Sequence, residues 1–232
     1  MATRLEPLIP MRINASCPAA RPARAGTANR SDDAGGPPAT YRRRVPVLPG
    51  RVDAERLTEM ALAARSLPYS YAEVGATRGS FPAGYRGDRY SIDLGQDGTT
   101  FDRAVEGLRG WQAHVRAGAR VAPEGVEIET GATVVVAVRV AFLTAVAPCR
   151  IVYVLDEAHR FGFGYGTLAG HPERGEESFV VSRAGNRVTF DIAAFSRPAG
   201  ALTRLGAPIA RAVQKNVTRR YLTGLRSYVE RA

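Results

Sequence analysis

The chain has 232 residues, of which 45% are hydrophobic and 23% are charged, close to the average for a globular protein. This composition excludes disorder throughout the chain, because enough apolar side chains are present to bury a core. The longest apolar run ends at Arg139 and is far shorter than the roughly 18 residues of a membrane-spanning helix. We therefore expect no transmembrane segment.

The net charge of +10 is unevenly distributed along the chain. Residues 1–52 hold nine arginines against three acidic residues, whereas residues 197–232 hold eight basic residues against Glu230, so the segment between them carries −3. Lys215 is the only lysine, which favours a bias toward arginine codons over a selected phosphate-binding surface. A nucleic-acid partner is not expected, although Arg42, Arg43 and Arg44 could contact phosphates or an anionic membrane.

The N-terminal segment predicts a disordered tail over residues 1–48, rich in arginine, proline and alanine, before a single α+β domain over residues 49–231. Its few apolar residues are broken up by Pro10 and Arg12, so it does not have the pattern of a secretory signal. We expect a cytoplasmic protein whose two cysteines, Cys17 and Cys149, are free thiols.

The first predicted elements are helical. A helix is expected from the N-cap Asp53 to Leu67, because Pro68 stops it. The irregular segment 69–85 contains four aromatic residues and predicts either a lid over the core or a wall that contacts a ligand. A strand over 89–94 and a helical stretch over 99–118 follow, with a break at Gly110.

From Val121 the apolar period changes to two, which predicts an antiparallel meander. The expected strands are 132–142, 149–158, 161–168, 176–182 and 187–196, with 126–129 as an additional candidate. In one strand Gly162, Gly164 and Gly166 alternate with aromatic residues, which indicates that something approaches its bare face closely. An amphipathic helix beginning near Pro208 is long enough to cross the whole sheet.

Four segments carry a resemblance to a known family: Tyr71–Thr77, Tyr165–Glu173, Gly175–Glu177 and Ala194–Pro198. They resemble the bacterial and plant family catalogued as domain of unknown function 1990, also described as UPF0548-like, and the resemblance implies no established activity. The predicted order of elements is also similar to the helix-grip layout of START-like and birch-allergen-like proteins. That layout implies an apolar cavity between a curved antiparallel sheet and the C-terminal helix, which the aromatic segment 69–85 could instead fill.

The candidate site residues follow from these expectations. The residues expected to line a cavity and bind a small hydrophobic or amphipathic ligand are Trp111, Arg139, Tyr153, Tyr165, Thr167 and Phe195. His171, with Glu173, Glu176 and Glu177, supplies the candidate acid and base groups, although the structural alternative is favoured, in which His171 shapes a turn and the glutamates face water or pair with arginines. No phosphate-binding loop, dinucleotide fingerprint or metal motif occurs, so we expect no cofactor and no metal.

Three functions remain open at this point. The first is a binder of a small hydrophobic ligand, motivated by the glycine strand, the aromatic residues and the terminal helix. The second is an enzyme of the cyclase or hydrolase type in which His171 and Glu176 converge as acid and base. The third is an interaction module whose arginine-rich tail and helix face contact an anionic partner, which predicts binding that weakens with salt.

Overall fold

The computed structural model describes residues 47–199 and 207–231, and all of them belong to one compact unit. The predicted tail lies almost wholly outside the described residues, as do Cys17 and the run Arg42–Arg44. The helical elements are α1 (Ala54–Ala63), η2 (Ala64–Ser66), η3 (Ala76–Arg78), α2 (Gly98–Arg109), α3 (Gln112–Arg116) and α5 (Ala207–Val229). None of the helices in the described ranges is long and apolar enough to cross a membrane.

The strands form one antiparallel sheet. They are β1 (Val47–Pro49), β2 (Arg86–Gln96), β3 (Ala119–Ala122), β4 (Thr133–Val140), β5 (Leu143–Glu157), β6 (Arg160–Thr167), β7 (Glu173–Ala184) and β8 (Arg187–Pro198). Their order is β2-β8-β7-β6-β5-β4-β3, and β1 pairs with the first residues of β5. The predicted α+β fold, with an antiparallel sheet and a long C-terminal helix, is confirmed.

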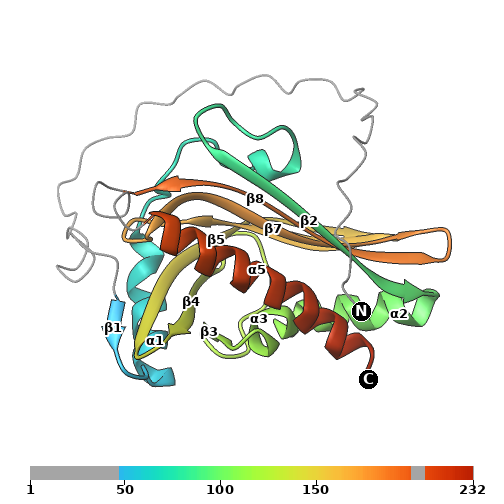
Figure 1. Ribbon diagram of the computed structural model, residues 1–232, viewed down its shortest axis with the longest axis horizontal. Coiled ribbons are helices and arrows are strands. Elements are labelled where there is room, and N and C mark those ends of the chain that lie inside the picture. The colour runs from blue at the N-terminus through green and yellow to red at the C-terminus, as the bar shows by residue number, and fades with distance from the viewer. Residues whose placement is uncertain (1–46, 200–206, 232) are drawn as a thin grey trace, which may run out of the picture. The chain divides into compact units, whose positions relative to one another are not determined.

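One face of the sheet carries the main core. Phe163, Phe179 and Phe190 are fully buried there, together with residues of α2, α3 and the second half of α5. Figure 1 shows α5, in red, running along this face. Two glycines let the helices approach closely: a Cβ on Gly107 would lie 2.7 Å from Leu225, and one on Gly224 would lie 2.9 Å from a carbonyl oxygen of α3. The second half of α5 is thereby fixed against α2 and α3.

The opposite face is covered by α1 and by residues 69–85. Leu57 and Ala61 of α1 pack on Val135 and Val146 of the sheet. The segment 69–85, in teal above the sheet in Figure 1, covers β7 and β8, because its aromatic rings surround Phe195 at centroid distances of 5.1 to 6.0 Å. This segment is therefore a lid over the outer face of the sheet, and it does not fill the space beside α5.

The glycines of β6 have the close neighbours that their pattern predicted. A Cβ on Gly164 would lie 2.6 Å from the ring of Tyr153, and one on Gly166 would collide with the hydroxyl of Tyr71. Tyr153 reaches this face because the register of β5 shifts between Ile151 and Tyr153, which turns Tyr153 away from the face that carries Ile151. Two tyrosine rings thus take the place of side chains on β6.

We expect Gly166→Ala to lower the free energy of unfolding by about 2 kcal/mol, because the added methyl must displace the ring of Tyr71 from a packed site. Chemical denaturation measures this loss. Gly110→Ala is the matched control, because a Cβ there meets its nearest atom at 3.4 Å in an ordinary backbone conformation. Equal effects of the two substitutions would contradict the close approach of Tyr71.

Several element boundaries differ from the prediction. Residues 119–122 form the strand β3, which the sequence pattern did not predict. Residues 126–129, the additional candidate strand, do not form one. β5 begins at Leu143, because its first residues pair with both β4 and β1. The N-cap of α2 is Asp97, whose carboxylate accepts from the backbone N–H of Thr100 at 2.8 Å. The break at Gly110 is confirmed, since α2 ends immediately before it.

Candidate functional site

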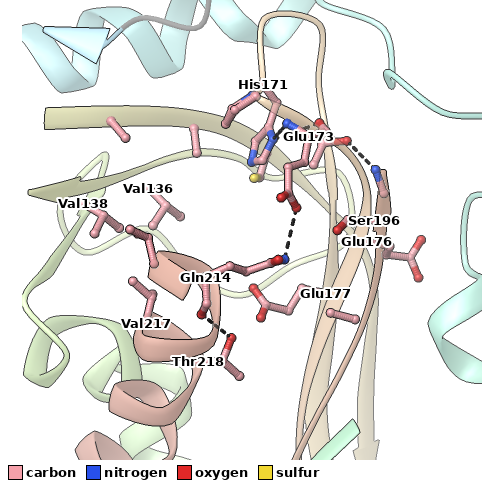
Figure 2. Close-up of a pocket in the computed structure, with 18 of the residues that line it drawn as sticks. Val136, Val138, His171, Glu173, Glu176, Glu177, Ser196, Gln214, Val217 and Thr218 are labelled. Atoms are coloured by element: carbon pink, nitrogen blue, oxygen red, sulfur yellow. Dashed lines mark hydrogen bonds between the residues drawn. The ribbon is translucent and has the colours of Figure 1, made fainter. Parts of the chain in front are cut away.

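A cavity of about 610 Å³ lies between the sheet and the first half of α5. Apolar side chains of β4, β5 and α5 make up much of its wall, among them Val136, Val138, Ala145, Ala147, Val213 and Val217. Polar groups stand on the walls formed by β6, β7 and α5, as Figure 2 shows for Glu173, Glu177, Gln214 and Thr218. The cavity is therefore an apolar chamber with polar groups concentrated on one part of its wall.

The two neighbouring glutamates of β7 point to opposite faces of the sheet, because side chains alternate along a strand. Glu177 points toward α5 and borders the cavity, whereas Glu176 points away from it (Figure 2). Glu176 is 2% exposed. One glutamate therefore belongs to the cavity, and the other belongs to the contact between the sheet and residues 69–85.

The carboxylate of Glu177 is hydrogen-bonded to a buried tyrosine of β6. The hydroxyl of Tyr165 donates to Oε2 of Glu177 at 3.0 Å, and Nε2 of His114 lies 3.4 Å from the same hydroxyl. The pKa of Glu177 is raised to about 7, mainly by burial and in smaller part by the charge of Glu173, while the hydrogen bond from Tyr165 opposes the shift. Glu177 can therefore give or take a proton near neutral pH.

His114 is fully enclosed in the aromatic core behind Tyr165. Its ring packs against Trp111, Phe179 and Tyr221 at centroid distances of 4.5 to 5.0 Å. Burial lowers the pKa of His114 to about 3, so the ring is neutral at physiological pH. It can polarise Tyr165, but it places no positive charge beside the cavity.

Glu176 ties the segment 69–85 to the sheet. Its Oε2 accepts from the hydroxyl of Tyr71 at 2.7 Å and from the backbone N–H of Gly75 at 2.6 Å. Its Oε1 accepts from the backbone N–H of Thr77 at 3.0 Å and from the hydroxyl of Thr77. All acceptor directions of this carboxylate are used in positioning the segment, which is a structural role.

His171 lies in the turn between β6 and β7. Its Nδ1 accepts from the backbone N–H of Glu173 at 3.0 Å, and burial lowers its pKa to about 4. No hydrogen bond joins His171 to Glu176 among the described residues. Across the cavity, Nε2 of Gln214 donates to Oε2 of Glu173 at 3.1 Å, which links α5 to the start of β7 (Figure 2).

The predicted lining residues fall in two groups. Tyr165 and Thr167 border the cavity, as does Phe195, although the ring of Phe195 packs against Tyr71 and Tyr85 on the outer face. Trp111, Tyr153 and Arg139 lie outside the cavity wall. Ligand binding by any of these residues remains a prediction.

Trp111 lies in the core, where its indole N–H donates to the carbonyl of Val126 at 2.9 Å. Tyr153 is on the outer face, where its hydroxyl lies 2.9 Å from that of Thr77. Arg139 is exposed near the end of β4 and donates to the carbonyl of Ala141 at 3.0 Å. Its neighbours Val138 and Val140 border the cavity, so alternation turns Arg139 away from it.

Sequence reasoning grouped Glu173 with His171 as a candidate acid or base group, but it missed Gln214 and Thr218 as polar groups of the cavity. The signal for Gln214 and Thr218 was a four-residue spacing on the terminal helix, which places both on one face beside Val217. Within the described ranges no three histidine, cysteine, aspartate or glutamate side chains are grouped so that they could hold a metal ion.

Comparison with known proteins gives the family. A model described as a domain of unknown function, DUF1990, matches residues 70–224, which include the segment 71–77, Glu177 and most of α5. The chain belongs to the DUF1990 family. This DUF1990 protein is 38% identical over 167 residues to a UPF0548 protein of Deinococcus radiodurans, a match covering 66% of this chain and 83% of that protein.

More distant similarities extend to plants and to solved structures. The UPF0548 protein At2g17695 of Arabidopsis thaliana is 32% identical over 134 residues, 54% of this chain and 64% of that protein. A hypothetical protein of Helicobacter pylori has a TM-score of 0.48 at 11% identity, covering 65% of this chain and 95% of that one. Ara h 8.0201 has a TM-score of 0.42 at 11% identity, covering 64% of this chain and 100% of that one.

Proposed function

We propose that this DUF1990 protein binds a small hydrophobic or amphipathic molecule in the cavity between its sheet and α5. The observation that carries the proposal is the cavity itself, whose volume of about 610 Å³ lies within the range of roughly 300–1,000 Å³ of small-molecule sites. Its apolar walls favour a hydrocarbon body, because water gains few hydrogen bonds there. Tyr165 and Glu177 supply a polar anchor for one end of the ligand.

The alternative enzyme, in which His171 and Glu176 act as a pair, has no support in the geometry. His171 is engaged with the backbone of its own turn, and the carboxylate of Glu176 is engaged with Tyr71, Gly75 and Thr77 on the other face of the sheet. The interaction module depends on the tail, which lies almost wholly outside the described residues, and on the helix face that carries Lys215, Arg219 and Arg226. It remains a prediction. Salt-dependent binding that is lost when residues 1–46 are deleted would favour it.

The binding proposal is tested by native mass spectrometry of the full chain, purified gently from cells. We expect a reproducible added mass that disappears after denaturing extraction and is recovered as a small molecule in the organic phase. A chain that carries no added mass and also fails to bind a neutral apolar dye, such as N-phenyl-1-naphthylamine, would overturn the proposal.

Filling the cavity should weaken binding. Ala147 borders the cavity from β5, and Ala147→Phe places a ring in the space that a ligand would occupy. We expect the affinity for N-phenyl-1-naphthylamine to fall by about tenfold or more, which corresponds to about 1.4 kcal/mol. Fluorescence titration measures the change. Ala158→Phe is the matched control, because Ala158 is exposed in the turn between β5 and β6. Equal affinities in both variants would place the dye outside the cavity.

A further inference from the structure

The charges that border the cavity are unbalanced. Three glutamates of β7 border it, and the carboxyl groups of Glu173 and Glu177 face its interior, whereas that of Glu176 is bound to residues 71–77 on the other face of the sheet. Among the described lining residues the positive side chains are Arg86 and Arg197, and both are exposed, so solvent screens them. His171 is neutral, because burial lowers its pKa to about 4. The interior of the cavity is therefore acidic within a chain whose net charge is +10.

The surroundings of Glu177 suit a cation. Tyr165 donates to its Oε2, and Oε1 accepts no hydrogen bond from the described residues. Tyr165 and Tyr221 both border the cavity and contribute aromatic rings beside the carboxylate. Besides Glu173, whose charge repels that of Glu177, the titratable groups around Glu177 are the thiol of Cys149 and the phenols of these two tyrosines. Burial raises the pKa of all three, so they are neutral near pH 7. Among the described residues of β5, β6 and α5, no positively charged side chain therefore neutralises Glu177.

We propose that the cavity selects amphipathic molecules whose polar end is a protonated amine, with Glu177 as the counter-charge. This inference rests on the proposed binding function and names its ligand class. An ammonium group beside Oε1 of Glu177 would donate a charge-assisted hydrogen bond to that oxygen. It would also be attracted to the faces of the tyrosine rings. A ligand that ends in a carboxylate would meet two like charges in a site of low dielectric constant, and its binding is opposed.

The test compares three ligands with the same ten-carbon chain: decylamine, decanoate and 1-decanol. Each ligand is titrated into the full-length protein loaded with N-phenyl-1-naphthylamine at pH 8, below the concentration at which it forms micelles. The loss of dye fluorescence measures displacement. We expect decylamine to bind about tenfold more tightly than 1-decanol, and decanoate to bind most weakly. Because the chain is basic overall, attraction of the amine to the protein surface does not produce this order.

Substitution of Glu177 locates the effect. Glu177→Gln should remove the preference for decylamine over 1-decanol, whereas Glu157→Gln, at the exposed end of β5, should retain it. In the unchanged protein, affinity for decylamine should rise about tenfold from pH 6 to pH 8, because a carboxyl with a pKa of about 7 ionises in this range while the amine stays protonated. In Glu177→Gln the affinity should be constant over this range.

The outcomes separate this inference from the binding function. If 1-decanol displaces the dye and decylamine binds no more tightly, or if Glu177→Gln keeps the preference, the amine inference is overturned and the binding function stands. If none of the three ligands displaces a bound dye, the amine inference is likewise overturned. If the dye itself does not bind, or if Ala147→Phe leaves its affinity unchanged, the binding function in this cavity is overturned.

Discussion

Replacement of Glu176 by alanine is expected to lower the free energy of unfolding by about 4 kcal/mol. The substitution removes an acceptor that serves Tyr71, Gly75 and Thr77, and it leaves their donors unpaired beneath a covered surface. Buried donors without partners lose their hydration and gain nothing in return. Urea denaturation followed by circular dichroism measures the loss of stability.

A second readout distinguishes local from global effects of the Glu176 substitution. We expect residues 69–85 to become susceptible to limited proteolysis under conditions in which the unchanged protein is resistant, because Glu176 is the main polar tie between this segment and β7. Glu157→Ala is the matched control, since its carboxylate is exposed and lies 3.7 Å from the guanidinium of Arg160 in a surface ion pair. A loss below about 1 kcal/mol for Glu176→Ala would contradict the role assigned to it.

The neighbouring substitution, Glu177→Gln, is expected to stabilise the protein at pH 8 by up to about 3 kcal/mol. The pKa of Glu177 is raised from 4.5 to about 7, so the folded state binds this proton more tightly than the unfolded state does. Stability contributed by the protonated carboxyl is present in full below pH 4.5 and is lost as the pH rises to about 7. Glutamine cannot ionise and avoids this loss.

The measurement is the free energy of unfolding of both proteins at several values between pH 4.5 and pH 8. The difference should be near zero at the acidic end and largest at pH 8, because glutamine resembles the protonated carboxyl and still accepts from Tyr165. A constant difference across the range would show that Glu177 does not titrate near neutrality. Substitution of Glu176 should therefore destabilise the protein and substitution of Glu177 should stabilise it. The difference arises because the two side chains lie on opposite faces of the sheet.

The sequence predicted this arrangement in part. A strand was expected over 176–182, but Glu176 and Glu177 were grouped with His171 as candidate acid and base groups, and the pattern could not say which of them faces the helix. That choice depends on the partner of each face, and the residues covering the outer face, Tyr71 and Thr77, lie about a hundred positions earlier in the chain. Long-range contacts of this kind leave no periodic signal in either segment.

Local irregularities account for other differences. Tyr153 shares the apolar pattern of its strand, yet a single register shift moves it to the outer face, and nothing in its immediate sequence marks that shift. By contrast, the close approach to the glycines of β6 was predicted correctly, because the absence of a side chain has a direct steric meaning at any position in a strand. The groups that approach Gly164 and Gly166 are the rings of Tyr153 and Tyr71, and not the ligand that the glycine strand favoured. Sequence patterns therefore predicted the strands better than the faces on which their side chains stand.

The open sheet leaves β2 at one edge, with consequences for self-association. An edge strand with free backbone groups can recruit a strand of another molecule. Here β2 carries Arg86, Asp88, Arg89 and Asp93, and its register breaks between Asp93 and Gly95. Closely spaced charges and a bulge make a poor template for a second chain. The protein should therefore resist aggregation through this edge even at concentrations at which a flat apolar strand would nucleate fibrils.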